Sequence, residues 1–243
     1  MSKSRDREAE KYILKKNGTP HLRVEITAEN AMFTNPLYTE KVSYDVITPS
    51  AAEGALRNIY SHKGCIYKID KIYVLNPIVK ENIKCNYVAS KLKKAEALRY
   101  YRDKIDSLSI NSTAGTENQP MNTLRLKDVK YIIDFHVEID NTMANEGDTS
   151  YKFAFILADR LIRGQEWSTP YLGMREYPCD IKILEPESDI PVSKNKGIYD
   201  IGFMFYGWDR NWALNKMSRI MYHPIMKNGM IDVANAVLYR EVE

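Results

Sequence analysis

The sequence is poor in cysteine and contains no long apolar run. Its three cysteines, Cys65, Cys85 and Cys179, are an odd number at wide spacings, which argues against a disulfide framework and against a zinc site. No apolar stretch is long enough to cross a membrane, and the charged N-terminal segment lacks the apolar core of a signal peptide. We therefore expect a protein of the reducing cytoplasm that has no membrane partner.

Motifs of the common catalytic classes are also missing. Neither a phosphate-binding G-x-x-x-x-G-K nor a G-x-S-x-G nucleophile motif occurs. The four histidines are scattered, and none forms H-x-x-x-H. His136 lies between Asp134 and Glu138 on one predicted strand face, which fits either a metal ligand or a solvated strand face, and we favour the solvated face. The sequence therefore predicts no metal site and no cofactor.

Positive charge is concentrated in one segment. The net charge of the 243 residues is only +3, but residues 79–104 hold eight Lys or Arg and three acids, a balance of +5. A solvated insertion would explain this segment. So would an arm that binds a phosphate backbone, because each neutralised phosphate releases counterions. The 17 tyrosines add rings on which RNA bases can stack.

Hydrophobic periodicity predicts an α+β fold. Four segments have the alternation or the β-branched composition of strands, and two have the apolar spacing and capping residues of helices. In chain order they are a strand at 21–28, a helix at 48–64, strands at 65–77 and 130–140, a helix at 149–165 and a strand at 178–186. This β-α-β-β-α-β order is that of a ferredoxin-like domain.

The remaining segments complete the predicted domain organisation. Residues 1–20 are expected to form a flexible tail, and residues 21–186 the ferredoxin-like domain. A basic insertion at 79–122 interrupts that domain and ends in a polar, flexible loop. Short strands with turns at Asp-Arg-Asn and Asn-Gly indicate a small antiparallel β domain at 187–243.

Four local stretches point to a known family. The chain contains, in this order, FTNPLYTEKVSYDVITPSAAEGALRNIY, YVLNPI, NTLRLKDVKYIIDFHVE and RGQEWSTPYLGMREYP. These stretches resemble, in the same order, the Cas-five proteins of CRISPR subtype I-C, which are members of the RAMP superfamily. The resemblance runs from Phe33 to Pro178, and only the insertion is poorly matched. The C-terminal part matches weakly, around IMKNGMIDV.

The resemblance implies an RNA-binding subunit of a CRISPR surveillance complex, with an RRM-like ferredoxin domain and a small C-terminal β-sheet domain. Proteins of this subtype resemble endoribonucleases that cut the repeat transcript without metal and then stay on the 5′ handle of the product, in antiviral defence. The implied partners are repeat RNA, mature guide RNA, and the backbone and large subunits of the complex. The alternative is a non-catalytic subunit that binds the handle and nucleates assembly.

The resemblance also implies catalytic residues. The family's proposed set is a Tyr after the first helix and a Lys-His pair at the start of the second. The Tyr falls on Tyr60, the Lys on Lys152 and the His on Phe153. Phe153 cannot carry a proton, and at helical spacing it joins an apolar stripe that faces the core. We therefore predict that Tyr60 and Lys152 are catalytic, with His62 as the candidate for the missing imidazole.

Contacts to the RNA handle are expected from the basic insertion and from the loop after the second helix. The predicted residues are Asn86, Ser90, Lys91, Lys93, Lys94, Gly173 and Arg175. Gly173 would let the backbone approach a nucleotide closely. Arg175 would pair with a phosphate or with a base edge.

Overall fold

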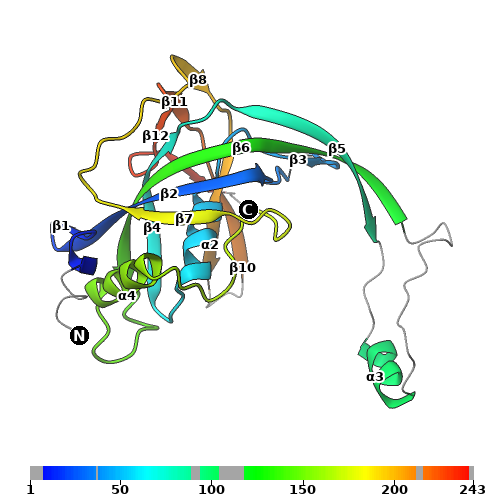
Figure 1. Cartoon of the computed structure of the whole chain (residues 1–243), viewed down its shortest axis with the longest axis horizontal. Helices are drawn as coiled ribbons and strands as arrows, with labels where there is room; N and C mark the ends of the chain where they lie inside the picture. The colour runs from blue at the N-terminus through cyan, green and yellow to red at the C-terminus, as the bar shows by residue number, and fades with distance from the viewer. Residues whose placement is uncertain (1–7, 37, 89–93, 104–117, 212–215, 241–243) are drawn as a thin grey trace.

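The computed structural model describes residues 8–36, 38–88, 94–103, 118–211 and 216–240, and it is an α+β fold (Figure 1). A ten-stranded main sheet and a three-stranded C-terminal sheet, of order β13-β10-β9, account for the strands. The helices are α2 (Pro49–Ile59), α3 (Lys94–Asp103) and α4 (Ser150–Ile162). The main sheet contains β1 (Leu14–Lys16), β2 (Thr19–Ala31), β3 (Lys41–Val42), β4 (Cys65–Val74), β5 (Val79–Val88), β6 (Asn118–Ile139), β7 (Asp180–Leu184), β8 (Ile198–Asp200), β11 (Ile225–Lys227) and β12 (Met230–Asp232). The small sheet contains β9 (Met204–Asn211), β10 (Lys216–Tyr222) and β13 (Leu238–Arg240).

The middle of the main sheet carries the predicted order of elements. Along the chain β2, α2, β4, β6, α4 and β7 follow one another, interrupted by β3 and by the insertion that holds β5 and α3. In the sheet β7, β2, β6 and β4 are neighbours in that order, and each pair is antiparallel. The helices α2 and α4 pack against these strands on one side of the sheet (Figure 1). Among the described residues, no helix has both the length and the apolar character needed to cross a bilayer.

The alternation of apolar and polar residues along the strands decides which face of the sheet the helices cover. In β6, Tyr131, Ile133, Phe135 and Val137 are buried in the core that also contains Phe153 of α4. The intervening residues of β6 point to the opposite face, because successive side chains of a strand alternate. Burying one such large apolar side chain contributes about 1.5–3 kcal/mol. The predicted alternation over 130–140 is therefore confirmed, and it fixes the register of β6.

Capping residues place the ends of the two helices. The Thr48 side chain accepts a hydrogen bond from the Ala51 N–H at the start of α2, and Thr149 accepts one from the Lys152 N–H at the start of α4. The helix α2 ends at Tyr60, whose backbone is extended at φ −147°. Tyr60 therefore follows the first helix directly, and Lys152 lies in the first turn of the second.

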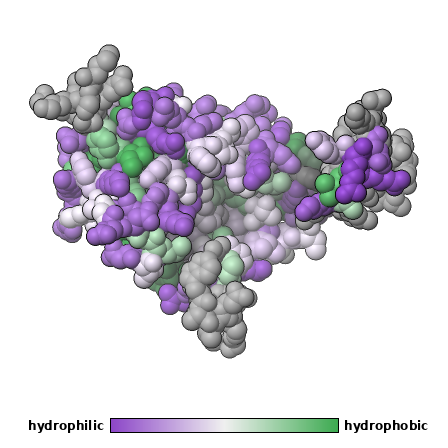
Figure 2. Space-filling model, turned by 90° about the horizontal axis from the view of Figure 1, so that it is seen from below, coloured by the Kyte–Doolittle hydropathy of each residue, from purple (hydrophilic) through white to green (hydrophobic). Residues whose placement is uncertain are grey.

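The insertion is more regular than the sequence predicts. Within the predicted insertion, β5 pairs with the first part of β6, from Val79 opposite Lys127 to Val88 opposite Asn118, and most of the predicted flexible loop lies outside the described residues. Figure 1 shows this two-stranded arm reaching away from the body, with α3 beyond its end. In Figure 2 the lobe at the right-hand edge is mostly hydrophilic. Residues 81–86 of β5 do alternate, with Asn82, Lys84 and Asn86 exposed and the residues between them half-buried. The charged Glu81 among the half-buried positions weakens the apolar alternation, so no strand was predicted there.

The N-terminal segment also differs from its prediction. Within residues 1–20, expected to be a flexible tail, β1 pairs with β2 through a turn at Asn17 and Gly18. Both turn residues have positive φ, 51° and 82°, as the tight turn of a hairpin requires. Ala9 is fully buried against the core. The Asn-Gly pair was the sequence signal for this hairpin. Because the residues around it are charged, the segment was predicted to be a flexible tail instead.

The C-terminal residues contribute to both sheets. The strands β9, β10 and β13 form the predicted small antiparallel sheet, whereas β12 pairs with β4 at the edge of the main sheet. The predicted Asn-Gly turn joins β11 to β12, with φ of 49° at Asn228 and 81° at Gly229. The Asp-Arg-Asn sequence, predicted to be a turn, instead ends β9. A domain boundary at residue 187 stays a prediction.

Two loops meet at one end of the helices. Gly64, in the loop between α2 and β4, lies against Ala144 in the loop between β6 and α4. The carbonyl of Gly64 accepts a hydrogen bond of 2.8 Å from the Asp140 N–H. Gly64 has φ +77°, and a Cβ there would lie 2.8 Å from the Ala144 Cβ and 2.9 Å from its backbone. Only glycine permits this approach, which brings the residues after α2 close to those before α4.

Gly64→Ala should destabilise the protein more than Gly147→Ala does. The two glycines have similar φ, +77° and +81°, so each substitution carries a backbone strain of about 1–2 kcal/mol. Only position 64 adds a steric clash, because nothing lies within 4 Å of a Cβ at position 147. Urea unfolding measures the difference. Equal losses of stability would mean that the two loops do not depend on this contact.

Candidate active site

Tyr60 ends α2 and is held through its backbone. Its N–H donates to the carbonyl of Leu56 at 3.1 Å, and its carbonyl accepts a hydrogen bond of 2.8 Å from the Tyr67 hydroxyl. Arg160 of α4 crosses to the same place, donating to the carbonyl of Ile59 at 2.7 Å, with its guanidinium 5.8 Å from the centre of the Tyr60 ring. The two helices therefore fix Tyr60 from both sides.

Three aromatic rings meet beside this helix end. The His62 ring lies 5.2 Å from the Phe153 ring and 6.4 Å from the Tyr60 ring, and the rings of Tyr60 and Phe153 are 6.2 Å apart between centroids. Phe153 is fully buried, as the apolar stripe of its helix predicts. The structure thus brings His62 next to the side chain that stands where the resemblance expects a histidine.

Asp148 connects Lys152 with His62. Lys152 Nζ donates to Asp148 Oδ1 at 2.8 Å, and His62 Nδ1 lies 3.7 Å from Asp148 Oδ2. The Asn145 N–H donates to the same carboxylate at 3.1 Å. The Asp148 side chain is only 4% exposed, whereas that of Lys152 is 53% exposed. Lys152 is therefore anchored at one side and accessible to a ligand at the other.

The hydrogen bonds of His62 define its tautomer. Nδ1 lies 2.9 Å from the carbonyl oxygen of Lys63, and a carbonyl oxygen can only accept. Nδ1 therefore carries the proton, and Nε2 of the neutral ring keeps its lone pair. Within the described part of the chain, no residue forms a hydrogen bond with Nε2. This nitrogen is arranged to take a proton from a ligand.

The charges nearby set different protonation states for Tyr60 and Asp148. Burial, reinforced by Cys65 and Asp148, raises the pKa of Tyr60 above its usual value near 10, against a smaller opposing effect of Arg160. Tyr60 is therefore a hydrogen-bond donor at neutral pH and not a base. The hydrogen bond from Lys152 lowers the pKa of Asp148, so that this carboxylate is ionised at neutral pH.

A comparison with known proteins gives a family relationship that covers most of the chain. Residues 21–234 match the family model described as CRISPR-associated protein (Cas_Cas5), of the Cas5d type. The chain belongs to the Cas5d family of CRISPR-associated proteins. The family assignment predicted from the four sequence stretches is therefore confirmed.

Two relatives and two solved structures are similar to the chain. CRISPR pre-crRNA endoribonuclease Cas5d of Mannheimia succiniciproducens is 30% identical over 216 residues, which are 87% of this chain and 94% of that protein. The protein of the same name from Thermus thermophilus is 29% identical over 171 residues, 70% of this chain and 66% of that protein. The crystal structure of a CRISPR-associated protein has a TM-score of 0.64 at 21% identity, and it matches 90% of this chain and 96% of its own. A functionally uncharacterized protein from Streptococcus mutans has a TM-score of 0.61 at 20% identity, with the same coverage.

The predicted RNA contacts of this Cas5d-family chain are spread over the arm and one loop. Asn86 and Lys94 are exposed, Asn86 on β5 and Lys94 at the first residue of α3. Asn86 shares one face of β5 with Lys80, Asn82 and Lys84, and all four are exposed. Ser90, Lys91 and Lys93 lie outside the described residues. Since β5 and α3 reach away from α2 and α4 (Figure 1), Asn86 and Lys94 do not lie next to Tyr60 and Lys152.

Gly173 and Arg175 lie in the loop between α4 and β7. Gly173 has φ +84°, and a Cβ there would lie 1.8 Å from the carbonyl oxygen of Met32. The glycine is therefore needed for packing against the end of β2, whatever it contributes to RNA. Arg175 is exposed, and none of the described residues binds its side chain. Its guanidinium can therefore reach a ligand.

Two residues of the site are missing from the sequence-based prediction. Asp148 precedes Lys152 by four positions, and this i,i+4 spacing of opposite charges was the available signal. Its contact with His62 depends on the approach of two loops, which no local pattern reveals. Arg160 belongs to the same helix as Lys152, and its contact with α2 is likewise a tertiary one.

Asp148→Asn should reduce the acid sensitivity of the fold. The folded-state pKa of Asp148 is lowered, so the ionised group stabilises the protein above the ordinary Asp value of about 3.9, and this stabilisation is lost as pH falls through the lowered value. Asparagine keeps the shape without the charge. The variant should be less stable at pH 7 and should lose less stability on acidification, as measured by chemical unfolding at several pH values.

Lys152→Met is the matched control, because it removes the partner of Asp148 and leaves the carboxylate. It should also flatten the dependence of stability on pH. Stability curves parallel to that of the wild type in both variants would contradict a role of this ion pair.

Proposed function

We propose that this protein is a metal-independent endoribonuclease that cleaves precursor CRISPR RNA in its repeat and stays bound to the 5′ handle. The observation that carries the proposal is the meeting of Tyr60, His62 and Lys152 around Asp148. The names of the two relatives support the substrate. We also infer that residues 19–184 are a ferredoxin-like unit of the RAMP type, on the basis of the strand order β7-β2-β6-β4.

The proposed reaction uses the RNA's own 2′-hydroxyl as the nucleophile. His62 Nε2 takes the 2′-proton, and the 2′-oxygen attacks the adjacent phosphorus. Lys152 stabilises the negative charge that develops on the phosphoryl oxygens. The bond from phosphorus to the 5′-oxygen breaks, and that oxygen is protonated as it leaves. The products are a 2′,3′-cyclic phosphate and a 5′-hydroxyl, so the step requires no co-reactant.

Tyr60 acts in this scheme as a donor. Its raised pKa keeps the phenol protonated at neutral pH, so it donates a hydrogen bond to the reacting phosphate or a proton to the leaving 5′-oxygen. Asp148 is a positioning residue. It holds the Lys152 ammonium at 2.8 Å and lies on the Nδ1 side of His62, where a carboxylate stabilises the imidazolium that forms.

Handle binding is assigned to the arm and to the loop after α4. The exposed face of β5 with Lys84 and Asn86 would follow a phosphate backbone, and the basic side chains predicted at positions 91, 93 and 94 would extend it. Arg175 would add a contact from the body of the protein. The backbone and large subunits of the complex as partners, and the cytoplasmic location, stay predictions.

One observation favours a second candidate function. Phe153 replaces the family's histidine and is fully buried, so the site lacks the imidazole at its usual position. If His62 does not substitute for it, the protein is a non-catalytic subunit that binds the handle and assembles the complex. Cleavage of the protein's own repeat RNA decides between the two.

Tyr60→Phe, His62→Gln and Lys152→Ala should each slow single-turnover cleavage in EDTA much more than they weaken RNA binding. Removal of a proton-transfer group typically costs about 10²–10⁴-fold in rate, and removal of one charge-stabilising contact about 10²–10³-fold. Cleavage and binding are measured on the same repeat RNA. Wild-type rates in all three variants would show that the site is misplaced. Tight binding without any wild-type cleavage would favour the assembly subunit.

Exchange of two ring positions tests whether His62 replaces the family's histidine. His62→Phe should abolish most cleavage, and the double variant His62→Phe/Phe153→His should recover part of it, because the two rings lie 5.2 Å apart at the same site. Phe153→His alone places a polar group in the core and should mainly lower stability. Identical rates in the single and the double His62 variants would contradict the substitution.

A further inference from the structure

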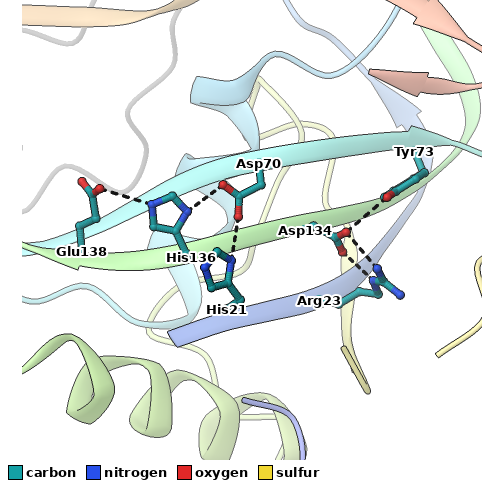
Figure 3. Close-up of polar contacts among 7 residues, drawn as sticks. All are labelled: His21, Arg23, Asp70, Tyr73, Asp134, His136 and Glu138. Atoms are coloured by element: carbon teal, nitrogen blue, oxygen red, sulfur yellow. Dashed lines mark hydrogen bonds and ion pairs between the residues drawn. The ribbon is translucent and has the colours of Figure 1, made fainter. Parts of the chain in front are cut away.

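Two histidines and an aspartate meet on the sheet face opposite the helices (Figure 3). His21 and His136 are direct partners in the register of β2 and β6, and their ring centroids are 5.0 Å apart. Asp70 comes from β4, where the register with β6 shifts between Ile69 and Lys71. Such a bulge adds one residue and re-aims its side chain, here toward the two imidazoles. Three neighbouring strands thus supply one polar group each.

We propose that His21, Asp70 and His136 form a binding site for Zn²⁺. One ligand atom from each lies within 4.8 Å of the other two. Asp70 Oδ2 is 3.1 Å from His21 Nδ1, and Asp70 Oδ1 is 2.8 Å from His136 Nδ1. Ligands about 2.0–2.1 Å from a tetrahedral zinc ion are separated by about 3.3 Å. Small side-chain rotations therefore convert the present contacts into a coordination sphere.

Glu138 supplies the outer partner that zinc-binding histidines use. Its Oε1 lies 3.3 Å from His136 Nε2. A metal-bound histidine commonly donates its second N–H to a carboxylate, which fixes the ring and its tautomer. The charges of Asp70 and Glu138 together balance those of Zn²⁺. The side chains of His21, Asp70 and His136 are 26%, 17% and 21% exposed, so the ion would be partly shielded from water.

A neighbouring polar cluster on the same face cannot bind a metal ion. Arg23 donates two hydrogen bonds to Asp134, of 2.6 and 2.9 Å, and the Tyr73 hydroxyl lies 3.4 Å from the same carboxylate (Figure 3). A guanidinium is always charged and has no lone pair for a metal. Asp70 faces imidazoles, which are the commonest metal ligands in proteins. The difference in chemistry makes one cluster a structural ion pair and the other a metal site.

A fourth ligand position would be open to solvent. His21 and Asp70 line a cavity of about 380 Å³ between the N-terminal hairpin and the segment after β12. Zinc held by three protein ligands keeps one position for water or for an exogenous ligand. Lys68 lies opposite His136 in the register of β4 and β6, and its charge opposes a cation. We therefore expect weaker binding than that of a four-ligand site.

Zinc titration of the tag-free protein in a Cys85→Ser background tests the proposal by calorimetry. That background removes the free thiol of the arm. One equivalent of Zn²⁺ should bind, and His136→Asn or His21→Asn should weaken binding by more than about 10–100-fold, the range typical of a lost outer partner. Glu138→Gln should weaken zinc binding by an amount within that range. His223→Asn is the matched control, because His223 pairs with Asp200 at 2.6 Å outside the site and should leave the affinity unchanged.

Cobalt provides a second measurement that does not depend on variants. One equivalent of Co²⁺ should give the strong visible absorption of a four-coordinate ion, and Zn²⁺ should displace it. Circular dichroism and metal-free thermal unfolding establish that each variant is folded. Zinc binding of wild-type affinity in a folded His21→Asn/His136→Asn variant would overturn the proposal. So would the absence of one-equivalent binding in the parent protein.

Discussion

The close approach of two loops at Gly64 and Ala144 is the contact on which the candidate site depends. Gly64 joins α2 to β4, whereas Ala144 joins β6 to α4, so the contact links the end of one helix to the start of the other. Tyr60 and His62 follow α2 and Lys152 lies in the first turn of α4, so this contact, together with the hydrogen bond from Arg160 to the Ile59 carbonyl, fixes the distance between them. A residue with no catalytic group thus sets the geometry of those that have one.

In the proposed mechanism, the imidazole of the site acts from the loop position of His62, while Phe153 occupies the helix position where the resemblance expects a histidine. In the first turn of α4, position 153 points into the core, where an apolar ring packs without needing a hydrogen-bond partner. The loop position of His62 provides what an imidazole needs, a carbonyl acceptor from Lys63 and a carboxylate at 3.7 Å. The same local volume therefore contains one apolar ring on the helix and one ionisable ring on the loop.

Sequence reasoning succeeded where a residue's role depends on burial. The alternation in β6 and the helical stripe through Phe153 follow from one buried face, so both could be predicted. In the arm of β5 and β6, the alternating inner positions of β5 are only half-buried and include the charged Glu81, so the strand was not predicted. Asp148 could not be assigned to the site because its partner His62 lies in another loop. The cluster of His21, Asp70 and His136 depends on the pairing of three strands and on a bulge. The local sequence around His136 could not predict either of these.

The two faces of β6 are physically coupled, although their chemistry differs. A shift of one residue in the register of a strand would move its buried side chains to the opposite face. Burial of Ile133, Phe135 and Val137 prevents such a shift. The same register necessarily holds His136 opposite His21, so the apolar core that supports α4 on one face also determines the spacing of the polar groups on the other. The bulge at Asp70 is then the one local adjustment needed to complete the cluster.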